Sequence, residues 1–264
     1  MCAPDFFGVD YVINPWMKDE IGKTDHARAV QQWGSLKRWL SQRAELLFVP
    51  PQKGLPDMVF TANAGAVLGK KVIVSRFHAP ERSGEEPLFR RWFEQHGFEI
   101  VAWPDAVEFE GAGDALFDRE QNILWMGHGF RTDRAAAGLL EQHFGRKVMP
   151  LRLVDPRFYH LDTCLCPLPG GYLMYYAAAF DADSLKIIEA QVHEEKRIAV
   201  EEDDALKFVC NAVDLDSHIY INGASTTLQD RLRSLGFAPI TVPLGEFMKS
   251  GGSAKCLTLK LVEN

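Results

Sequence analysis

Short apolar stretches recur along the chain, and each of them ends in small or polar residues. Four are clear, at positions 71–76, 123–127, 172–176 and 218–222. Short apolar runs of this kind, rich in aliphatic and aromatic residues, are typical of buried β-strands. The pattern therefore predicts strands at regular intervals along the sequence.

An amphipathic stretch with helical spacing follows three of these strands, at 87–96, 134–144 and 226–235. A second apolar segment comes next, and it opens in each case with a glycine, namely Gly97, Gly145 and Gly236. Glycine suits the residue after a helix because it adopts the left-handed conformation without a steric penalty from Cβ. The predicted unit is strand, loop, helix, strand.

Corresponding points of these units lie about 45 to 55 residues apart, a period typical of propellers and other repeat folds. About five units fit the chain. The first has a helix at 26–42 and a strand at 46–50, the second opens with a strand at 58–61, and the fourth has a less regular helix at 184–194. Alternating strands and helices favour an α/β fold over a pure β-propeller. The alternative, an open doubly wound sheet, lacks support because no Gly-x-Gly-x-x-Gly segment or P-loop joins a strand to a helix.

Composition places the chain among ordinary globular proteins. Of its 264 residues 47% are apolar and 25% are charged, and no segment resembles a linker, so we expect one domain over residues 1–264. Acidic side chains outnumber basic ones by 36 to 29, a formal charge of −7. This charge disfavours nucleic acids and anionic membranes as partners and favours a small cationic molecule. The sequence leaves the oligomeric state open, including a homo-oligomer.

Cysteines occur at positions 2, 164, 166, 210 and 256, and an odd, scattered set does not form a disulfide framework. A reducing compartment is the natural setting. The first residues lack a basic region followed by an apolar one, and no apolar run approaches membrane length, so we predict a cytoplasmic protein. His160, Cys164 and Cys166 suggest zinc only weakly, because Cys-x-Cys is shorter than the usual zinc spacing and no second pair follows.

Polar residues suited to catalysis fall where predicted strands begin or end. If the units surround an axis of pseudo-symmetry, equivalent strand ends converge on one central site. Such convergence would place a thiol, an imidazole and several carboxylates side by side. The residues concerned are Asn63, Glu110, Arg131, His160, Asp162 and Cys256.

Cys256 lies in a loop of glycine, serine and alanine that runs into an alternating apolar segment, which we predict to be a strand. Taken alone, a cysteine is more often an inert buried hydrophobe than a nucleophile. A thiolate nucleophile needs an imidazole that can act as an acid, and the imidazole needs a carboxylate that fixes its orientation. Cys256, His160 and Glu110 supply these parts. Asp114 and Asp162 are candidates for binding a cation beside the thiol.

These segments resemble the guanidino-group modifying superfamily, which includes arginine deiminases, dimethylarginine dimethylaminohydrolases, amidinotransferases and arginine dihydrolases. The resemblance spans the whole chain and rests on four motifs in family order: Asn63, Glu110-Gly-x-Gly-Asp114, His160-x-Asp162 and Gly-Gly-x-x-x-Cys256. It implies a five-bladed pseudo-symmetric α/β propeller, or pentein, with the active site at its centre. This fold agrees with the repeat of about five units.

The resemblance also implies roles for the residues. Cys256 would attack the guanidinium carbon of an arginine-like substrate to form a covalent amidino-thioether, and His160 would give a proton to the departing amine and take one from the attacking water. Glu110 would hold His160, and Asp162 would bind the guanidinium nitrogens. Carboxylates that grip a planar guanidinium orient it for attack, and a thiolate is favoured beside that cation. No metal and no cofactor are implied.

Asn63 marks a departure from part of this superfamily, because deiminases and dimethylarginine dimethylaminohydrolases have Asp at the equivalent place. An amide both donates and accepts, so it can bind a neutral ureido group as well as a cation. This points to arginine dihydrolases, whose N-terminal signature resembles that of this chain and adds Asn14 as a substrate contact. The alternative for Asn63 is a turn residue next to Gly65. Arg82 and Arg131 resemble the family's arginines for the substrate α-carboxylate, although the sequence equally allows either to be a solvated surface charge.

The sequence thus favours a hydrolase acting on L-arginine or a close analogue, with arginine dihydrolase, giving ornithine, ammonia and carbon dioxide, as the first choice. A dimethylarginine dimethylaminohydrolase giving citrulline and an amidinotransferase are the alternatives within the superfamily. A protein that only binds arginine is the alternative outside enzymes. The joint presence of Cys256, His160, Glu110 and Asp162 favours an enzyme, because a binding module needs no nucleophile.

Overall fold

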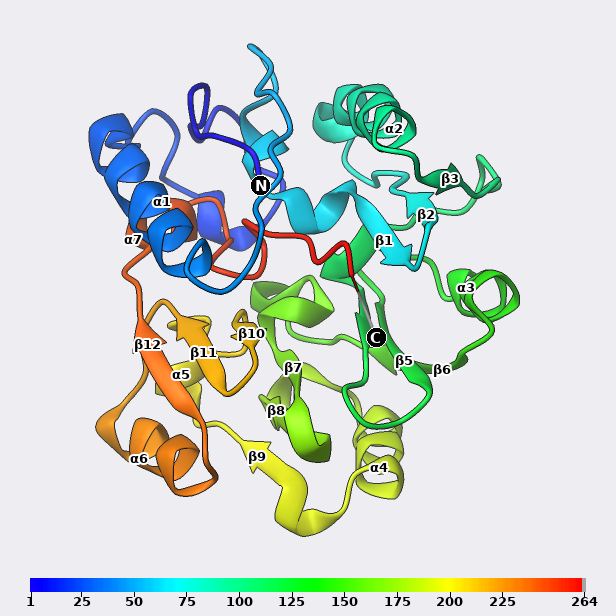
Figure 1. The fold of residues 1–264 in the computed structure, drawn as a ribbon, viewed down its shortest axis with the longest axis vertical. Coiled ribbons are helices and arrows are strands. Elements are labelled where there is room, and N and C mark those ends of the chain that lie inside the picture. Colours follow the sequence, from blue (N-terminus) through cyan, green and yellow to red (C-terminus); the bar gives the residue numbers. More distant parts are fainter. Residues whose placement is uncertain (263–264) are drawn as a thin grey trace.

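The computed structural model describes residues 1–262, and its strands form four small sheets of the same design. In each sheet two strands form an antiparallel hairpin, and a third strand pairs in parallel with the second. A parallel neighbour needs a crossover connection, and in every case a helix supplies it. Figure 1 shows the sheets on the inside of the molecule with their helices on the outer rim.

The strands and helices of the four sheets follow each other in chain order. The first sheet has β1 (Gly65–Leu68), β2 (Lys71–Val74), α2 (Glu86–Gln95) and β3 (Glu99–Ile100). The second has β4 (Ala115–Phe117), β5 (Ile123–His128), α3 (Ala136–Phe144) and β6 (Lys147–Arg152). The third has β7 (Leu165–Leu168), β8 (Tyr172–Tyr175), α4 (Ala182–Gln191) and β9 (Arg197–Ala199). The fourth has β10 (Val213–Leu215), β11 (His218–Ile221), α6 (Thr226–Ser234) and β12 (Ala238–Thr241).

The remaining helices lie before, between and after these sheets. The α-helices are α1 (His26–Leu40), α5 (Glu202–Ala205) and α7 (Gly245–Met248). The 3₁₀ helices are η1 (Pro15–Met17), η2 (Pro56–Val59), η3 (Thr61–Ala64), η4 (Pro80–Glu85), η5 (Gly111–Gly113), η6 (Pro156–Phe158), η7 (Leu161–Thr163), η8 (Pro169–Gly171), η9 (Ala177–Ala179) and η10 (Glu194–Lys196). Among residues 1–262, none of these helices has the length and apolarity needed to cross a bilayer.

The predicted unit of strand, loop, helix and strand is confirmed in all four sheets. The glycines after the helices also have the predicted backbone, with φ of 77° at Gly97, 62° at Gly145 and 90° at Gly236. Side chains rarely adopt such angles, so glycine allows the chain to leave the helix and enter the next strand. The mixed α/β class is therefore confirmed.

Three predicted strands are wrong. Residues 58–61 lie in and between η2 and η3, where Pro56 fixes the first turn and prevents an extended start. In the segment 46–50 the structure has only an isolated bridge from Val49 to Cys2, and the residues after Cys256 form a turn and irregular chain. Instead of pairing in a sheet, the segment after Phe60 bonds to the chain around Cys256. The Ala62 N–H donates to the Cys256 carbonyl oxygen at 3.0 Å, and the Thr61 hydroxyl donates to the Leu257 carbonyl oxygen at 3.1 Å.

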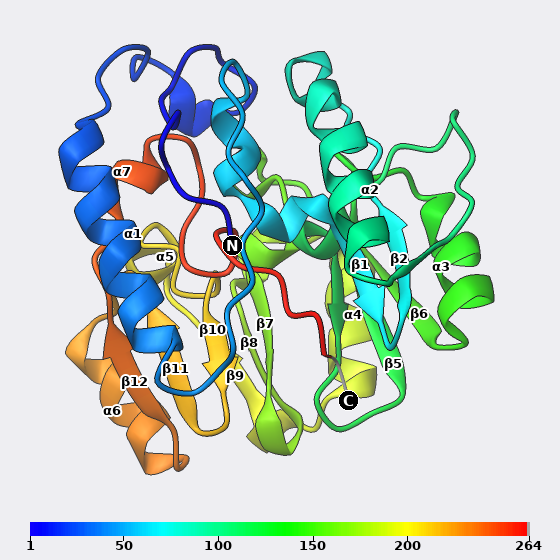
Figure 2. The same cartoon turned by 45° about the horizontal axis from the view of Figure 1, so that its top comes forward.

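The N-terminal and C-terminal segments together form one part of the molecule. Within residues 1–262 this part contains no three-stranded sheet. Helix α1 packs on α7 there, and Figure 2 shows the last described residues crossing toward the sheets. The core of this part is apolar and includes Trp33, Leu36 and Phe247. The five-bladed propeller accordingly stays a prediction, because its fifth sheet is not seen.

Candidate active site

Three short turns meet at the centre of the molecule, and they carry most of the predicted site. Turn η5 contacts both η3 and η7, and each of the three turns comes just before the first strand of a sheet. Asn63 lies in η3, Glu110 directly precedes η5, and His160 directly precedes η7, which contains Asp162. Cys256 joins them through the hydrogen bond from Ala62 in η3.

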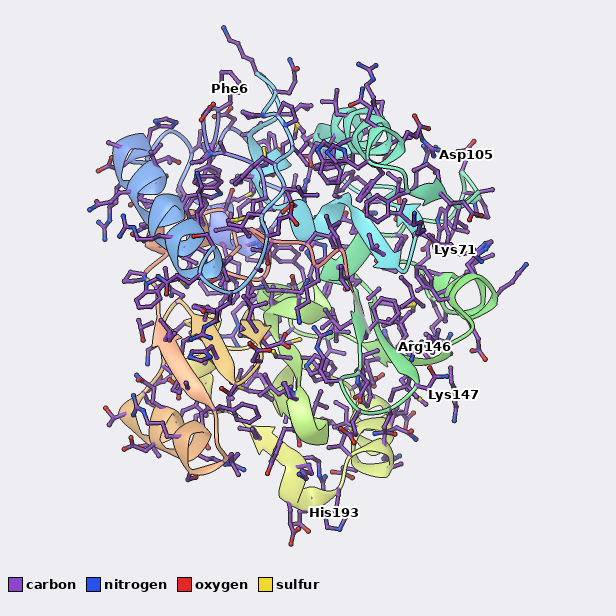
Figure 3. All side chains as sticks on the ribbon, in the orientation of Figure 1. Phe6, Lys71, Asp105, Arg146, Lys147 and His193 are labelled. Atoms are coloured by element: carbon purple, nitrogen blue, oxygen red, sulfur yellow. The ribbon has the colours of Figure 1, made fainter. Side chains whose placement is uncertain are left out.

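A small cavity lies beside these turns, and Asn63 and His160 are among the residues that line it. Among the described residues, the predicted site residues that line it are Asn14, Asn63, Arg82, Arg131, His160 and Cys256. Gly113 lets the turns approach so closely, because a Cβ there would lie 2.4 Å from Asn63 Nδ2 and 3.3 Å from the His160 ring. Figure 3 places the labelled charged residues Lys71, Asp105 and His193 at the outer edge, far from this centre.

His160 is oriented by Glu110, as the resemblance implies. Its Nε2 lies 2.7 Å from Glu110 Oε2, and Arg131 Nη1 donates to the same oxygen at 3.2 Å. The other Glu110 oxygen accepts from the His78 backbone N–H at 3.1 Å. Burial alone would raise the pKa of Glu110, but Arg131 and the His160 hydrogen bond outweigh it and bring that pKa to about 2. Glu110 is therefore a carboxylate at neutral pH.

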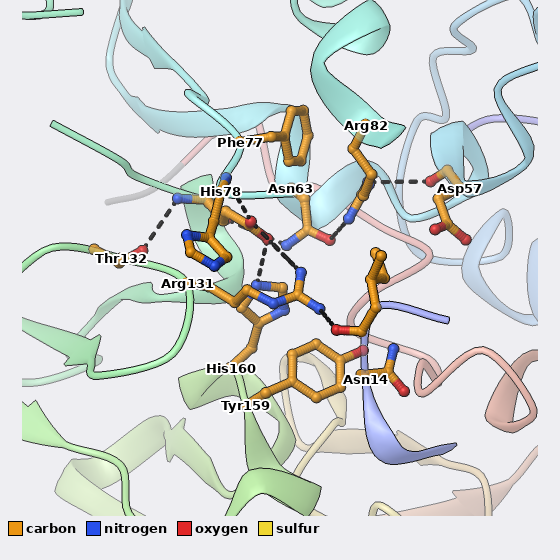
Figure 4. Close-up of polar contacts among 12 residues, drawn as sticks. Asn14, Asp57, Asn63, Phe77, His78, Arg82, Arg131, Thr132, Tyr159 and His160 are labelled. Carbon is orange, nitrogen blue, oxygen red and sulfur yellow. Dashed lines mark hydrogen bonds and ion pairs between the residues drawn. The ribbon is translucent and has the colours of Figure 1, made fainter. Parts of the chain in front are cut away.

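Arg131 and Arg82 are both buried, so the reading of either as a surface charge is wrong. Arg131 lies over the Tyr159 ring at 4.6 Å, and its Nη2 donates to the Ile13 carbonyl oxygen at 2.8 Å. Figure 4 shows this guanidinium between Tyr159 and His160. Arg131 thus joins the N-terminal segment to the Glu110 carboxylate.

Arg82 forms a two-pronged ion pair with Glu85, at 2.9 Å from Nε and 2.8 Å from Nη2. Its Nη1 donates to Asn63 Oδ1 at 2.9 Å (Figure 4). Such paired hydrogen bonds fix a guanidinium more rigidly than a single contact does. Asn63 in turn donates from Nδ2 to the Glu110 carbonyl oxygen at 3.2 Å. Asn63 does lie in the turn before Gly65, and its buried amide is held there by two partners.

Cys256 is only 3% exposed and faces the side-chain carboxyl group of Asp162. Its Sγ lies 3.5 Å from Asp162 Oδ2, and Asn211 Nδ2 donates to Sγ at 3.0 Å. Burial, followed by the charge of Asp162, raises the pKa of the Cys256 thiol well above its usual range. Burial also raises the pKa of Asp162 to about 7, although Lys255 opposes the shift. A cation placed between the thiol and Asp162 would stabilise the anionic forms of both.

Asn14 and Asp114 hold the surroundings of the cavity in place. Asn14 Oδ1 accepts from the Trp16 backbone N–H at 2.9 Å, and Asn14 Nδ2 donates to the Ser250 carbonyl oxygen at 3.0 Å. Asp114 accepts from the Thr132 hydroxyl at 2.7 Å and from the Leu161 N–H at 2.9 Å. Asp114, like Glu110 and Asp162, is not among the described residues that line the cavity. Its bonds to Thr132 and Leu161 tie η7 to the turn that follows Glu110.

The buried Asp114 makes stability depend on pH. Burial raises its pKa from 3.8 to about 6, against the opposing effects of His160 and Thr132. A raised folded pKa contributes stability that is complete below pH 3.8 and is lost as the pH rises through 6. We expect urea unfolding at pH 4 and 7.5 to show a smaller loss of stability in Asp114→Asn than in wild type, by about 2 kcal/mol.

Asp105→Asn is the matched control for this measurement, since the Asp105 side chain is 91% exposed. It should leave the pH dependence of the unfolding free energy as it is in wild type. An Asp114→Asn variant with the wild-type pH dependence would show that Asp114 is ionised equally in the folded and unfolded chain.

Several residues around the cavity escaped the sequence analysis. Asp57 lines it and accepts from the Tyr11 hydroxyl at 2.8 Å, but it was hidden next to a segment predicted as a strand. Asn211, which contacts the nucleophile, had a visible signal. Asn211-Ala212 directly precedes β10 in the same way that Asn63-Ala64 directly precedes β1. The repeat therefore pointed to Asn211 as the counterpart of Asn63.

The zinc alternative finds no support in the contacts of its candidate thiols. Cys164 Sγ lies 3.5 Å from the Leu161 carbonyl oxygen, and Cys166 Sγ lies 3.9 Å from that of Pro167. Within residues 1–262, no group of three or more His, Cys, Asp or Glu side chains is placed to hold a metal ion.

Comparison with known proteins agrees with the resemblance found in the sequence. Residues 12–263 match the model of the eukaryotic N,N dimethylarginine dimethylhydrolase family. The bifunctional arginine dihydrolase/ornithine cyclodeaminase ArgZ of Synechocystis sp. is 53% identical over 100% of this chain, which corresponds to 37% of ArgZ. The N(G),N(G)-dimethylarginine dimethylaminohydrolase of Mycobacterium tuberculosis is 38% identical over 99% of this chain and 84% of its own length.

Two solved structures of the N-terminal domain of ArgZ match with a TM-score of 0.99 and 52% identity, over 100% of this chain and 97% of that domain. One is a cysteine-to-serine mutant bound to substrate, and the other is an asparagine-to-serine variant covalently bound to a reaction intermediate. The chain spans 37% of the length of the curated arginine dihydrolases that it matches. The family match, the full-length identity and the central site together show that this chain belongs to the N,N dimethylarginine dimethylhydrolase family.

Proposed function

We propose that this chain is a hydrolase with a cysteine nucleophile that converts L-arginine to ornithine, two molecules of ammonia and carbon dioxide. The observation that carries the proposal is the buried Cys256 thiol, 3.5 Å from Asp162, in a cavity shared with His160 and Asn63. The 53% identity to a bifunctional arginine dihydrolase supports arginine as the substrate. The covalent intermediate in the ArgZ domain supports a covalent mechanism.

The charges around the cavity suit a zwitterionic amino acid with a cationic head. The substrate guanidinium would lie against both Cys256 and Asp162, where its charge favours the thiolate. Arg131 is proposed to bind the α-carboxylate, which would replace the Ile13 carbonyl oxygen now held at 2.8 Å. Asp57 lines the same cavity and offers a carboxylate for the α-ammonium group. Arg82, held by Glu85, keeps Asn63 in place through its bond to Oδ1.

The reaction can proceed in two similar rounds. The Cys256 thiolate adds to the guanidinium carbon, His160 gives a proton to the departing ammonia, and an amidino-thioether remains. Water deprotonated by His160 then adds to that carbon, the C–S bond breaks, and the ureido product citrulline forms in the cavity. A second round on citrulline consumes another water and releases ammonia, carbon dioxide and ornithine. Atoms balance as arginine plus two waters giving ornithine, two ammonia and carbon dioxide.

Asn63 is the residue that we propose to permit the second round. A ureido group has a carbonyl oxygen that accepts and N–H groups that donate, and an amide can satisfy either. A carboxylate at this place accepts only, and it would face the ureido oxygen without a proton between them. The family's Asp fits a guanidinium, which only donates, so an enzyme with Asp here would stop at citrulline.

Asn63→Asp should change the product of the reaction. The new carboxylate keeps the bond from Arg82 but loses the donor to the Glu110 carbonyl oxygen, now made at 3.2 Å. Binding of the ureido intermediate should weaken by about 1 to 3 kcal/mol, while the guanidinium step is affected less. We expect wild type to release ornithine and the variant to release mostly citrulline, as measured by mass spectrometry of products from arginine.

Asn222→Asp serves as the control, since Asn222 is also held by backbone groups but does not line the cavity among the described residues. It should still yield ornithine. A wild type that stops at citrulline, or that acts only on N-methylated arginine, would refute the dihydrolase proposal and favour a dimethylarginine dimethylaminohydrolase. That result would leave the Cys256 chemistry intact.

We also propose that residues 1–264 form one catalytic domain with five pseudo-symmetric blades around the cavity. The match to 97% of the ArgZ N-terminal domain supports the domain boundary. Four repeated sheets support the blades, and the terminal segments with α1 and α7 would form the fifth. All five cysteines are free buried thiols, which supports a reducing, cytoplasmic location.

A further inference from the structure

Asn211 holds Cys256 through two different hydrogen bonds. Asn211 Oδ1 accepts from the Cys256 backbone N–H at 3.1 Å, and Asn211 Nδ2 donates to Cys256 Sγ at 3.0 Å. The same Nδ2 donates to the Asp162 carbonyl oxygen at 3.1 Å. Asn211 is fully buried, so each of its polar atoms depends on these partners. One amide therefore links the nucleophile to the residue that carries the guanidinium-binding carboxylate.

The orientation of this amide follows from the partners. A backbone N–H only donates, so the Asn211 atom that faces the Cys256 N–H must be the oxygen. The Asp162 carbonyl oxygen only accepts, so the atom that faces it must be the nitrogen. Both constraints direct an Asn211 N–H toward Cys256 Sγ, independently of the state of the thiol.

We propose that Asn211 is a functional partner of the nucleophile, one whose amide fixes the Cys256 backbone and supplies the hydrogen-bond donor that stabilises the sulfur as an anion. The proposal rests on the proposed function, in which this sulfur attacks a guanidinium carbon. Hydrogen bonds to a charged group are stronger than those to its neutral form, so a fixed donor favours the thiolate. The donor is already in place before substrate arrives, and no reorganisation is needed at the moment of attack.

The surroundings of the sulfur explain why such a donor matters. Burial and the Asp162 charge both raise the pKa of the Cys256 thiol, while the bonds from Ser253 and Asn211 lower it. The ionisable groups that line the cavity with Cys256 or adjoin it are Asp57, Arg82, Glu110, Arg131, Tyr159, His160, Asp162 and Lys255. Two of these groups, Arg82 and Arg131, are already paired with the carboxylates of Glu85 and Glu110. The amide donor therefore acts on a thiol whose nearest carboxylate, Asp162, opposes ionisation.

The chain offers a matched control for Asn211. Asn222 Oδ1 accepts from the Leu244 N–H at 2.7 Å, and Asn222 Nδ2 donates to the Lys207 carbonyl oxygen at 3.1 Å and to Met248 Sδ at 2.9 Å. This amide makes the same three kinds of contact as Asn211, but its sulfur is a thioether that does not ionise. Replacing Asn222 by Asp thus disturbs the fold in a similar way without touching the thiol.

The test replaces Asn211 by Asp and measures the alkylation of Cys256 by iodoacetamide as a function of pH, with peptide mass spectrometry to locate the modified cysteine. Aspartate keeps the acceptor for the Cys256 N–H and removes the donor to Sγ. We expect alkylation below the wild-type midpoint to be slower by roughly 10- to 100-fold, a shift of about one to two pH units. The difference in alkylation rate between variant and wild type should disappear as the pH rises through that midpoint. A thiol that is only misplaced would react slowly at every pH.

Asn222→Asp should alkylate as wild type does, and Asn211→Ala, which also lacks the donor, should shift in the same direction as Asn211→Asp. An Asn211→Asp protein with the wild-type pH profile overturns the proposal. If Asn211→Asp does not fold, an Asn211→Ala protein with the wild-type pH profile overturns it in the same way. Arginine turnover by wild type is measured alongside. A wild type that makes no ammonia from arginine but whose Asn211→Asp variant shows the alkylation shift contradicts the proposed function and still supports the role of Asn211.

Discussion

Cys256→Ser is expected to abolish the release of ammonia from arginine, a loss of more than about 10⁴-fold in kcat. A serine hydroxyl ionises far less readily than a thiol at neutral pH, and Asp162 at 3.5 Å opposes an alkoxide as it opposes a thiolate. Serine differs from cysteine by one atom and has the same backbone, so the bonds from Ala62 and to Asn211 should persist. Ammonia and ornithine are measured in a steady-state assay with saturating arginine.

Binding separates loss of chemistry from loss of structure in this variant. Calorimetry should show that Cys256→Ser still binds arginine, because Asp162 and Arg131 are unchanged. Cys164→Ser is the matched control, since Cys164 is equally buried and its sulfur lies 3.5 Å from a carbonyl oxygen that a hydroxyl can use. It should keep its activity. A Cys256→Ser enzyme within about tenfold of wild type would remove Cys256 from the role of nucleophile.

The sheets could be predicted because their hydrophobic pattern is local. Strands β2, β5, β8 and β11 are short apolar runs, and the helices after three of them have a regular apolar stripe, so periodicity alone located these elements. The 3₁₀ turns η3, η5 and η7, which come before three of the sheets, have no such period. The segment 58–61 is as apolar as a strand, and only its contacts with the Cys256 loop decide that it curls. Local pattern therefore predicts the sheets better than it predicts the turns between them.

The same distinction between local pattern and tertiary packing applies to the site. Cys256, His160, Glu110 and Asn63 stood in recognisable motifs, and the turns η3, η5 and η7 carry three of them to the centre. Burial of Arg82 could not be read from its sequence, because the ion pair with Glu85 depends on how η4 packs. The tertiary contacts also give Asp114 a supporting place in the bonds that tie η7 to the turn after Glu110. A motif thus identifies the chemical groups, and packing decides which of them face the substrate.

His160→Ala should lower the steady-state turnover of arginine by a factor on the order of 100 or more. The imidazole is held with Nε2 2.7 Å from Glu110 Oε2, which leaves Nδ1 for proton transfer in the cavity. Without it, neither the acid that expels ammonia nor the base that activates water is present. Glu110 would also face an empty space in place of a hydrogen-bond donor, although Arg131 keeps it ionised at 3.2 Å. Ammonia release under saturating arginine measures the loss.

The two proton transfers occur one after the other, so a second measurement on His160→Ala can separate them. A substrate whose leaving group needs little protonation should still form the amidino-thioether on Cys256 in His160→Ala, and the adduct should accumulate because water is no longer activated. Intact-protein mass spectrometry after a short incubation would detect it, with Cys256→Ser as the blank. His193→Ala, at the outer edge of the molecule (Figure 3), should turn over arginine as wild type does. Normal turnover by His160→Ala would assign proton transfer to another group, and an adduct that never forms would mean that His160 is needed already for the attack of the sulfur.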